Sequence, residues 1–205
     1  QAGNGQRIPN SLGHGILYEF LNKNCHVDDY TSAGFTTIVE NAKNAKETYF
    51  TDLTSVSDEG KYFLVCDGSS SSGVRVWQAR DLMLQEGVVY RFSCWVANID
   101  VGYASHGAES RSNLEFRIEY EGTGEIGEQI AKFQAPTTIG KWEFHTAEFT
   151  AKKSGWHHIF IKNHNTQQAG NDFAIDDIYF GTKLTTEGDD TDEYFKLTVD
   201  KQYNV

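Results

Sequence analysis

The segment Asn113–Tyr120 alternates between polar and apolar residues at every position. Successive side chains of a β-strand point to opposite faces, so Leu114, Phe116, Ile118 and Tyr120 share one face. Charged residues occupy most of the other face. This pattern is typical of an antiparallel strand that buries one face in a core and exposes the other to water.

Other parts of the chain repeat the strand signal. Six further strand-like segments are bounded by Gly, Ser, Asn or Asp, at 61–67, 74–84, 88–99, 141–150, 155–163 and 171–181. The one helix-like stretch, Val39–Thr48, is short and polar, and it suits a single helix or an elaborated loop. Aromatic residues make up 13% of the 205 residues, and there are 19 Gly but only one Met, which favours strands over helices. We therefore predict an all-β fold, an antiparallel β-sandwich with jelly-roll topology.

The charge balance excludes two classes of partner. The chain has 18 Lys and Arg against 29 Asp and Glu, a formal net charge of −11. Nucleic acids and anionic lipids both require a basic surface, so neither is an expected partner. The sequence contains no apolar run long enough to insert into a membrane.

No motif identifies an enzyme. The sequence lacks GxSxG, HExxH, a P-loop and a GxGxxG that follows a strand. Two carboxylates facing each other, as in glycoside hydrolysis, stay open because many acidic pairs are available. The prediction is a protein that is not an enzyme, although it can be attached to one in a longer chain.

Several segments resemble a group of secreted β-sandwich domains. They are YEF at 18–20, DLTSVSDEGKYFLVCDG at 52–68, VYRFSCWVANI at 89–99, the APTTIGKW region of 132–142, and GNDFAIDDIYFG at 170–181. The group is the galactose-binding-like jelly roll, which includes carbohydrate-binding modules and MAM adhesion domains. Leu53 departs from the pattern, which usually has His there. The resemblance covers residues 16–181, leaving 1–15 as a polar lead-in and 182–205 as an acidic spacer followed by a terminal strand or the start of a neighbouring domain.

The resemblance implies a function outside the cytoplasm. Members of the group are usually non-catalytic domains of secreted or cell-surface proteins, and we expect this one to bind a polysaccharide or another glycan. One alternative is a MAM-like module that adheres to a protein surface. A second alternative is a glycoside hydrolase or lyase built on the same fold.

A candidate sugar site follows from alternation in residues 88–99. Tyr90 and Phe92 fall on the core side of this strand, and Arg91 and Trp95 fall on the other side. If this strand shares a sheet with Asn113–Tyr120, one polar and aromatic surface contains Trp95, Arg91, Arg117 and Glu115, overhung by Tyr103. The alternative is a solvated face with cross-strand ion pairs and a Trp95 that packs under a loop. Trp77, Trp142 and Trp156 are assigned to core or loop packing.

A structural calcium ion is also expected. The family-like segments supply the carboxylates of Glu19, Asp52, Asp176 and Asp177, and the resemblance implies that acids at these positions ligate calcium. Ile175 and Ile178 are three residues apart, which breaks strict alternation and predicts a bulge at the aspartate pair. We expect Glu19, Asp52 and Asp176 as ligands, with Asp177 as the substitute. The alternative is that these aspartates bind backbone amides or a lysine.

Three cysteines, Cys25, Cys66 and Cys94, lack any CxxC spacing, which argues against a zinc site. Cys66 and Cys94 lie at core-facing strand positions, so we predict small buried hydrophobic residues there. A disulfide to Cys25 is the alternative.

Overall fold

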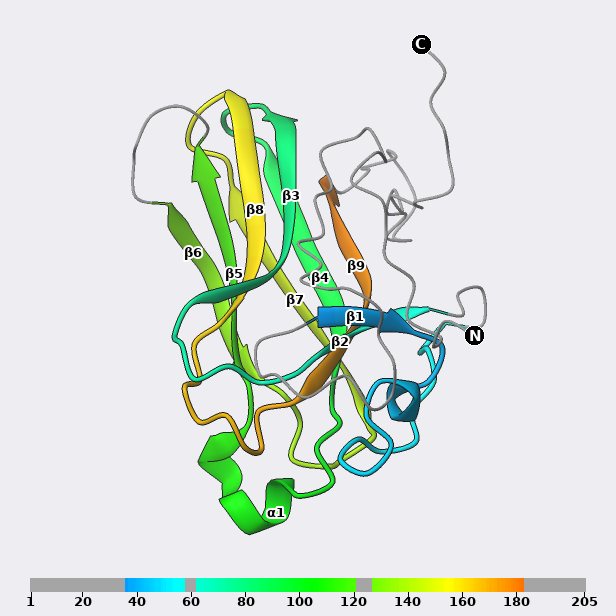
Figure 1. The fold of residues 1–205 in the computed structure, drawn as a ribbon. Helices are drawn as coiled ribbons and strands as arrows, with labels where there is room; N and C mark the ends of the chain where they lie inside the picture. Colours follow the sequence, from blue (N-terminus) through cyan, green and yellow to red (C-terminus); the bar gives the residue numbers. More distant parts are fainter. Residues whose placement is uncertain (1–35, 58–61, 121–126, 183–205) are drawn as a thin grey trace.

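The computed structural model describes residues 36–57, 62–120 and 127–182, which form two antiparallel sheets packed face to face (Figure 1). In these ranges the five-stranded sheet has the order β1 (Thr36–Val39), β2 (Phe63–Cys66), β9 (Phe173–Thr182), β4 (Val89–Asn98) and β7 (Trp142–Thr150). The four-stranded sheet has the order β3 (Val74–Leu84), β8 (Gly155–Asn163), β5 (Asn113–Tyr120) and β6 (Glu128–Gln134). The predicted all-β antiparallel β-sandwich is confirmed.

Helical structure is confined to short turns in the described ranges. These are the 3₁₀ turns η1 (Ala42–Asn44) and η2 (Ala108–Ser110) and the single-turn helix α1 (Tyr103–His106). The helix-like stretch 39–48 is therefore an elaborated loop around η1, which begins where the Asn41 side chain accepts a hydrogen bond from the Lys43 amide. None of the described helices has the length and apolar character needed to cross a membrane.

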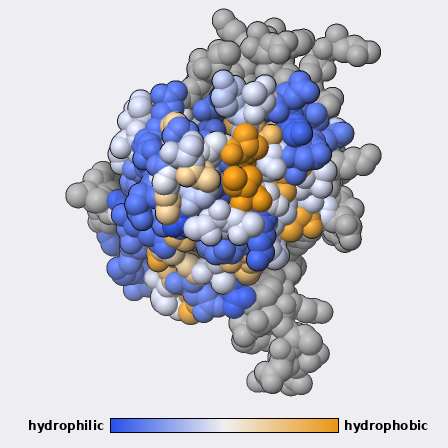
Figure 2. Space-filling model, turned by 90° about the horizontal axis from the view of Figure 1, so that it is seen from below, coloured by the Kyte–Doolittle hydropathy of each residue, from blue (hydrophilic) through white to orange (hydrophobic). Residues whose placement is uncertain are grey.

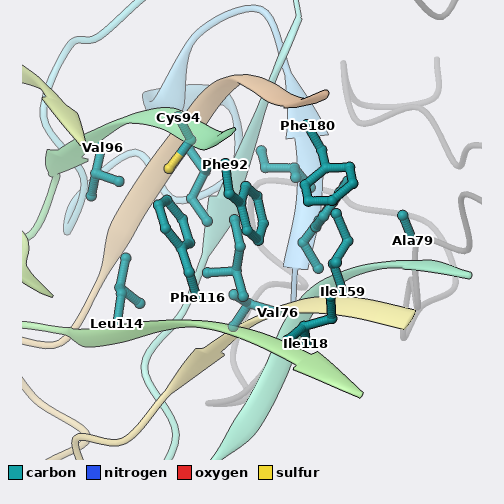
Figure 3. Packing of buried hydrophobic residues seen from close by; sticks show 14 of the residues in the cluster. Val76, Ala79, Phe92, Cys94, Val96, Leu114, Phe116, Ile118, Ile159 and Phe180 are labelled. Atoms are coloured by element: carbon teal, nitrogen blue, oxygen red, sulfur yellow. The ribbon is translucent and has the colours of Figure 1, made fainter. Parts of the chain in front are cut away.

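The core lies between the two sheets and centres on two phenylalanines (Figure 3). Phe92 of β4 and Phe116 of β5 stack with ring centroids 4.0 Å apart and an interplanar angle of 15°. Fully buried aliphatic residues from both sheets surround this pair, including Val96, Leu114 and Ile159. Aromatic stacking contributes about 0.5–1.5 kcal/mol beyond burial of area, so this pair is a strong link between the sheets.

A second, smaller cluster lies on the opposite side of the five-stranded sheet. The loop at 41–54 folds over this side and buries Phe50, Phe63 and Ile99. The Trp142 ring meets Phe63 edge-on, and its indole N–H donates to the Thr54 carbonyl at 3.0 Å. Part of the outer face of this sheet is consequently covered by the chain itself.

The predicted bulge in β9 is present. Trp95 pairs with Asp176 and Ser93 pairs with Tyr179, so two residues of β9 oppose Cys94 of β4. Asp177, one of these two, has a positive φ of 45°. Asp176 faces outward, on the same side as Trp95. Because a bulge adds one residue to the strand, Ile178 points back to the core although it is three residues after the core residue Ile175.

Cys66 and Cys94 are both buried in the core, as predicted, and Cys25 lies outside the described residues. The Cys94 side chain is fully buried, and burial raises the pKa of its thiol. A thiol must be exposed and ionised to react quickly.

Cys94 is therefore expected to resist a bulky thiol reagent in the folded protein and to react at once in denaturant. Peptide mapping by mass spectrometry after timed labelling measures the Cys94 peptide by itself. Rapid modification of Cys94 without denaturant would contradict its placement between the sheets.

Candidate ligand-binding face

The four residues expected on one surface are divided between the two sheets. Arg91 and Trp95 belong to β4 of the five-stranded sheet, whereas Glu115 and Arg117 belong to β5 of the four-stranded sheet. Both pairs face outward, and outer faces of a sandwich lie on opposite sides of the molecule. The expectation of a single combined surface is wrong because the two strands do not share a sheet.

Arg91 and Trp95 have partners on the neighbouring strand β7. The Arg91 guanidinium forms an ion pair with Glu148 at 2.6 Å. The Trp95 ring packs against Phe144, whose side chain is half exposed, with centroids 5.2 Å apart. Tyr103 begins α1 and is buried with 7% of its surface exposed, so it does not offer an open aromatic ring beside either pair.

The outer face of the four-stranded sheet carries aligned rows of side chains. Strand register places Arg75, Lys162, Glu115 and Lys132 in one row across all four strands. A second row consists of Gln78, Phe160, Arg117 and Gln129, and a third contains His158 and Glu119. We call this surface, together with Arg80, the charged face.

Glu115 is held by two donors on the charged face. Arg117 Nη1 donates to one carboxylate oxygen at 2.9 Å, and His164 Nε2 donates to the other. Burial alone raises the pKa of Glu115, but the hydrogen bonds and positive charges of His164 and Arg117 outweigh it and lower this pKa. The Glu115 carboxylate is thus ionised and fixed in position near neutral pH.

Glu119 connects the rows through longer ion pairs. Its carboxylate lies 3.5 Å from Arg75, from Arg117 and from Lys162. The Arg75 guanidinium also lies 4.1 Å from the centroid of the Phe160 ring. Phe160 is almost fully buried by these neighbours, so it supports the cations and does not itself offer a surface to a ligand.

An exposed tryptophan extends the charged face at one end. Trp156 of β8 is 51% exposed and pairs with Met83 of β3, which is 57% exposed. The assignment of Trp156 to core or loop packing is therefore wrong. The outward position of Trp156 could have been predicted from the alternation of side chains within 155–163, because Trp156, His158 and Phe160 fall on the same side of this strand.

The expected calcium ligands that lie in the described ranges have different hydrogen-bond partners. Glu19 lies outside the described residues. Asp52 accepts a hydrogen bond from Asn41 at 2.6 Å, and the buried Asp176 accepts from the Ser55 hydroxyl at 2.6 Å and from two backbone amides. Within the described ranges, no group of three or more His, Cys, Asp or Glu side chains is arranged to hold a metal ion. Calcium at this position stays a prediction.

Three buried aspartates, Asp67, Asp100 and Asp172, lie at the end of the sandwich that carries α1. Figure 2 shows this end from outside, as a mainly hydrophilic surface with a small apolar patch. Asp100 accepts from the amides of Gly102 and Gly170, each at 2.7 Å. Asp172 accepts from the Gly68 amide at 2.7 Å, and Asp67 pairs with Lys46 at 2.8 Å. Burial, followed by the charge of Asp67, raises the pKa of Asp172 from 3.8 to about 8. Sequence reasoning did not single out this cluster, because its members are far apart in the chain.

Comparison with solved structures finds several proteins with a similar fold. The chain is similar to an arabinose-bound GH51 α-L-arabinofuranosidase, with 13% identity and a TM-score of 0.50 over 73% of this chain and 22% of that one. It is also similar to the CBM22-1–GH10 modules of Clostridium thermocellum xylanase 10B complexed with xylohexaose (20% identity, TM-score 0.46, 73% of this chain and 25% of that one). A third likeness is the CBM22-1 xylan-binding domain of Paenibacillus barcinonensis Xyn10C (15% identity, TM-score 0.43, 75% and 90%).

These likenesses concern the fold alone, which is an antiparallel β-sandwich. The chain spans about a quarter of the length of the first two proteins. No protein-family model matches the chain, and no curated protein matches it either.

The raised pKa of Asp172 predicts how stability depends on pH. The folded protein holds this proton more tightly than the unfolded chain, so the stabilisation is complete below the unfolded pKa of 3.8 and is lost as pH rises towards about 8. We expect the melting temperature to fall by several degrees over this window and to fall less steeply in Asp172→Asn. Calorimetry at several pH values measures both slopes, with the exposed Asp81→Asn as the control. Equal slopes in the wild type and Asp172→Asn would contradict the assignment.

Proposed function

We propose that this chain is a non-catalytic glycan-binding domain of a secreted or cell-surface protein and that it binds its ligand on the charged face. The observation that carries the proposal is the combination of an exposed indole, Trp156, with aligned planar polar groups on the same side of one sheet. Sugar recognition requires these two elements together.

The chemistry of a pyranose fits this arrangement. The apolar C–H side of one sugar ring packs on a flat aromatic surface such as Trp156. The hydroxyls of further rings along the same sugar chain exchange hydrogen bonds with polar side chains of the charged face. Glu115 and Arg117 already hold each other at 2.9 Å, so little side-chain freedom is lost when a ligand binds.

The electrostatics favour binding over catalysis. Glycoside hydrolysis needs one carboxylic acid with a raised pKa, placed opposite a second carboxylate. Glu115 and Glu119 share the charged face, but both pair with Arg117, and the pKa of Glu115 is lowered. The partly exposed Glu119 suits hydrogen bonding to sugar hydroxyls, and the buried Glu115 does not suit proton donation to a glycosidic oxygen.

Replacement of Trp156 by Ala is expected to weaken glycan binding roughly tenfold or more, because the stacking surface is lost. A glycan array identifies a ligand, and titration calorimetry then compares the variants. Trp95→Ala is the matched control, since Trp95 lies on the opposite outer face of the sandwich.

Two other outcomes would support a different binding face or a different function. Loss of binding in Trp95→Ala alone would move the site to the outer face of the five-stranded sheet, beside Phe144. An absence of glycan binding at millimolar concentration, combined with self-association in sedimentation experiments, would favour the MAM-like adhesion module.

Calcium binding is tested separately. We expect a structural ion bound by Glu19, Asp52 and Asp176 to raise the melting temperature, with about 2.7 kcal/mol of stabilisation at 100 times its dissociation constant. Asp176 would have to exchange the Ser55 hydroxyl and the Val56 amide for the ion. Thermal unfolding before and after chelation, with elemental analysis, provides the measurement. An unchanged melting temperature and no detectable metal would rule the ion out.

A further inference from the structure

The charged face has a positive balance, in contrast to the chain as a whole. The chain carries a formal charge of −11. The charged face contains two carboxylates, Glu115 and Glu119, and five cationic side chains: Arg75, Arg80, Arg117, Lys132 and Lys162. Positive charge is therefore concentrated on this face.

Two of these cations are not neutralised. Across the described residues, neither Arg80 nor Lys132 forms an ion pair, whereas Arg75, Arg117 and Lys162 share the two carboxylates. The Arg80 guanidinium donates a long hydrogen bond of 3.4 Å to Gln78 Oε1.

Buried donors next to Arg80 lack acceptors. Gln78 is 2% exposed, and its Nε2 group has no hydrogen-bond partner among the described residues. The Nε atom of Arg80 is likewise buried without a partner in this part of the chain. Gln78 lies on the outward side of β3, in the row of Phe160 and Arg117. Gln78 is thus a buried neighbour of Arg80 and contacts its guanidinium through Oε1, whereas Arg80 itself is only partly buried and can reach a ligand.

We propose that Arg80, which contacts the buried Gln78 through its guanidinium, forms a subsite for an anionic group on the bound sugar chain, so that the ligand of the charged face is an acidic polysaccharide. The anionic group is a uronate carboxylate or a sulfate ester. Arg80 is only partly buried and supplies a planar fork of donors that matches either group. Arg75, which is 38% exposed, adds positive charge from the same strand. This inference rests on the proposed glycan-binding function.

The test compares three probes of similar length by titration calorimetry: hexagalacturonate, a sulfated galactan oligosaccharide and neutral xylohexaose. We expect one acidic probe to bind at least tenfold more tightly than xylohexaose. Arg80→Gln should remove this preference, with a loss of about tenfold or more for the acidic probe and little change for the neutral one. Gln78→Glu places a carboxylate beside Arg80 and should also repel the acidic probe.

Controls separate the subsite from the fold and from the proposed function. Arg91→Gln removes a cation from the other outer face and should leave all affinities unchanged, and circular dichroism checks that each variant is folded. Equal binding of acidic and neutral probes, with loss of both in Trp156→Ala, would overturn the anionic subsite and keep the glycan function. Binding of none of these probes, and of no glycan on an array, would overturn both.

Discussion

The stacked rings of Phe92 and Phe116 join the two sheets, and the outer surfaces depend on this contact. Neighbouring side chains in a strand point to opposite faces. Once Phe116 faces the core, Glu115 and Arg117 must face outward on the four-stranded sheet. Once Phe92 faces the core, Arg91 must face outward on the other sheet. The chemistry of each face is thus set by the hydrophobic residues that alternate with it.

This dependence explains which features the sequence could predict. Alternation within Asn113–Tyr120 and within 88–99 correctly indicated which residues face the core. Alternation is a local property of one strand and contains no information about which strands become neighbours. β4 and β5 are consecutive in the chain, yet the connection through α1 and η2 carries the chain from one sheet to the other. The proposed surface of Trp95 with Arg117 therefore could not form.

The buried carboxylates show that burial does not fix ionisation. Glu115 and Asp172 are both almost fully buried, and burial favours the neutral acid in each case. Glu115 faces a guanidinium and an imidazole, so its pKa is lowered. Asp172 faces Asp67, so its pKa is raised. These partners lie far away in sequence, which is why neither the charged face nor the aspartate cluster could be located before the strands were paired.

The irregular backbone of β3 affects how copies of this domain meet one another. In the described part of the chain, β3 is the outermost strand of its sheet, and its pairing with β8 is interrupted twice. At the second interruption Asp81 has a positive φ of 56°. An outer strand with a smooth backbone offers unpaired amides and carbonyls to any other extended chain, whereas a kinked and charged one does not. The same short stretch that presents Arg80 thereby makes this edge of the sandwich a poor template for a strand of another molecule.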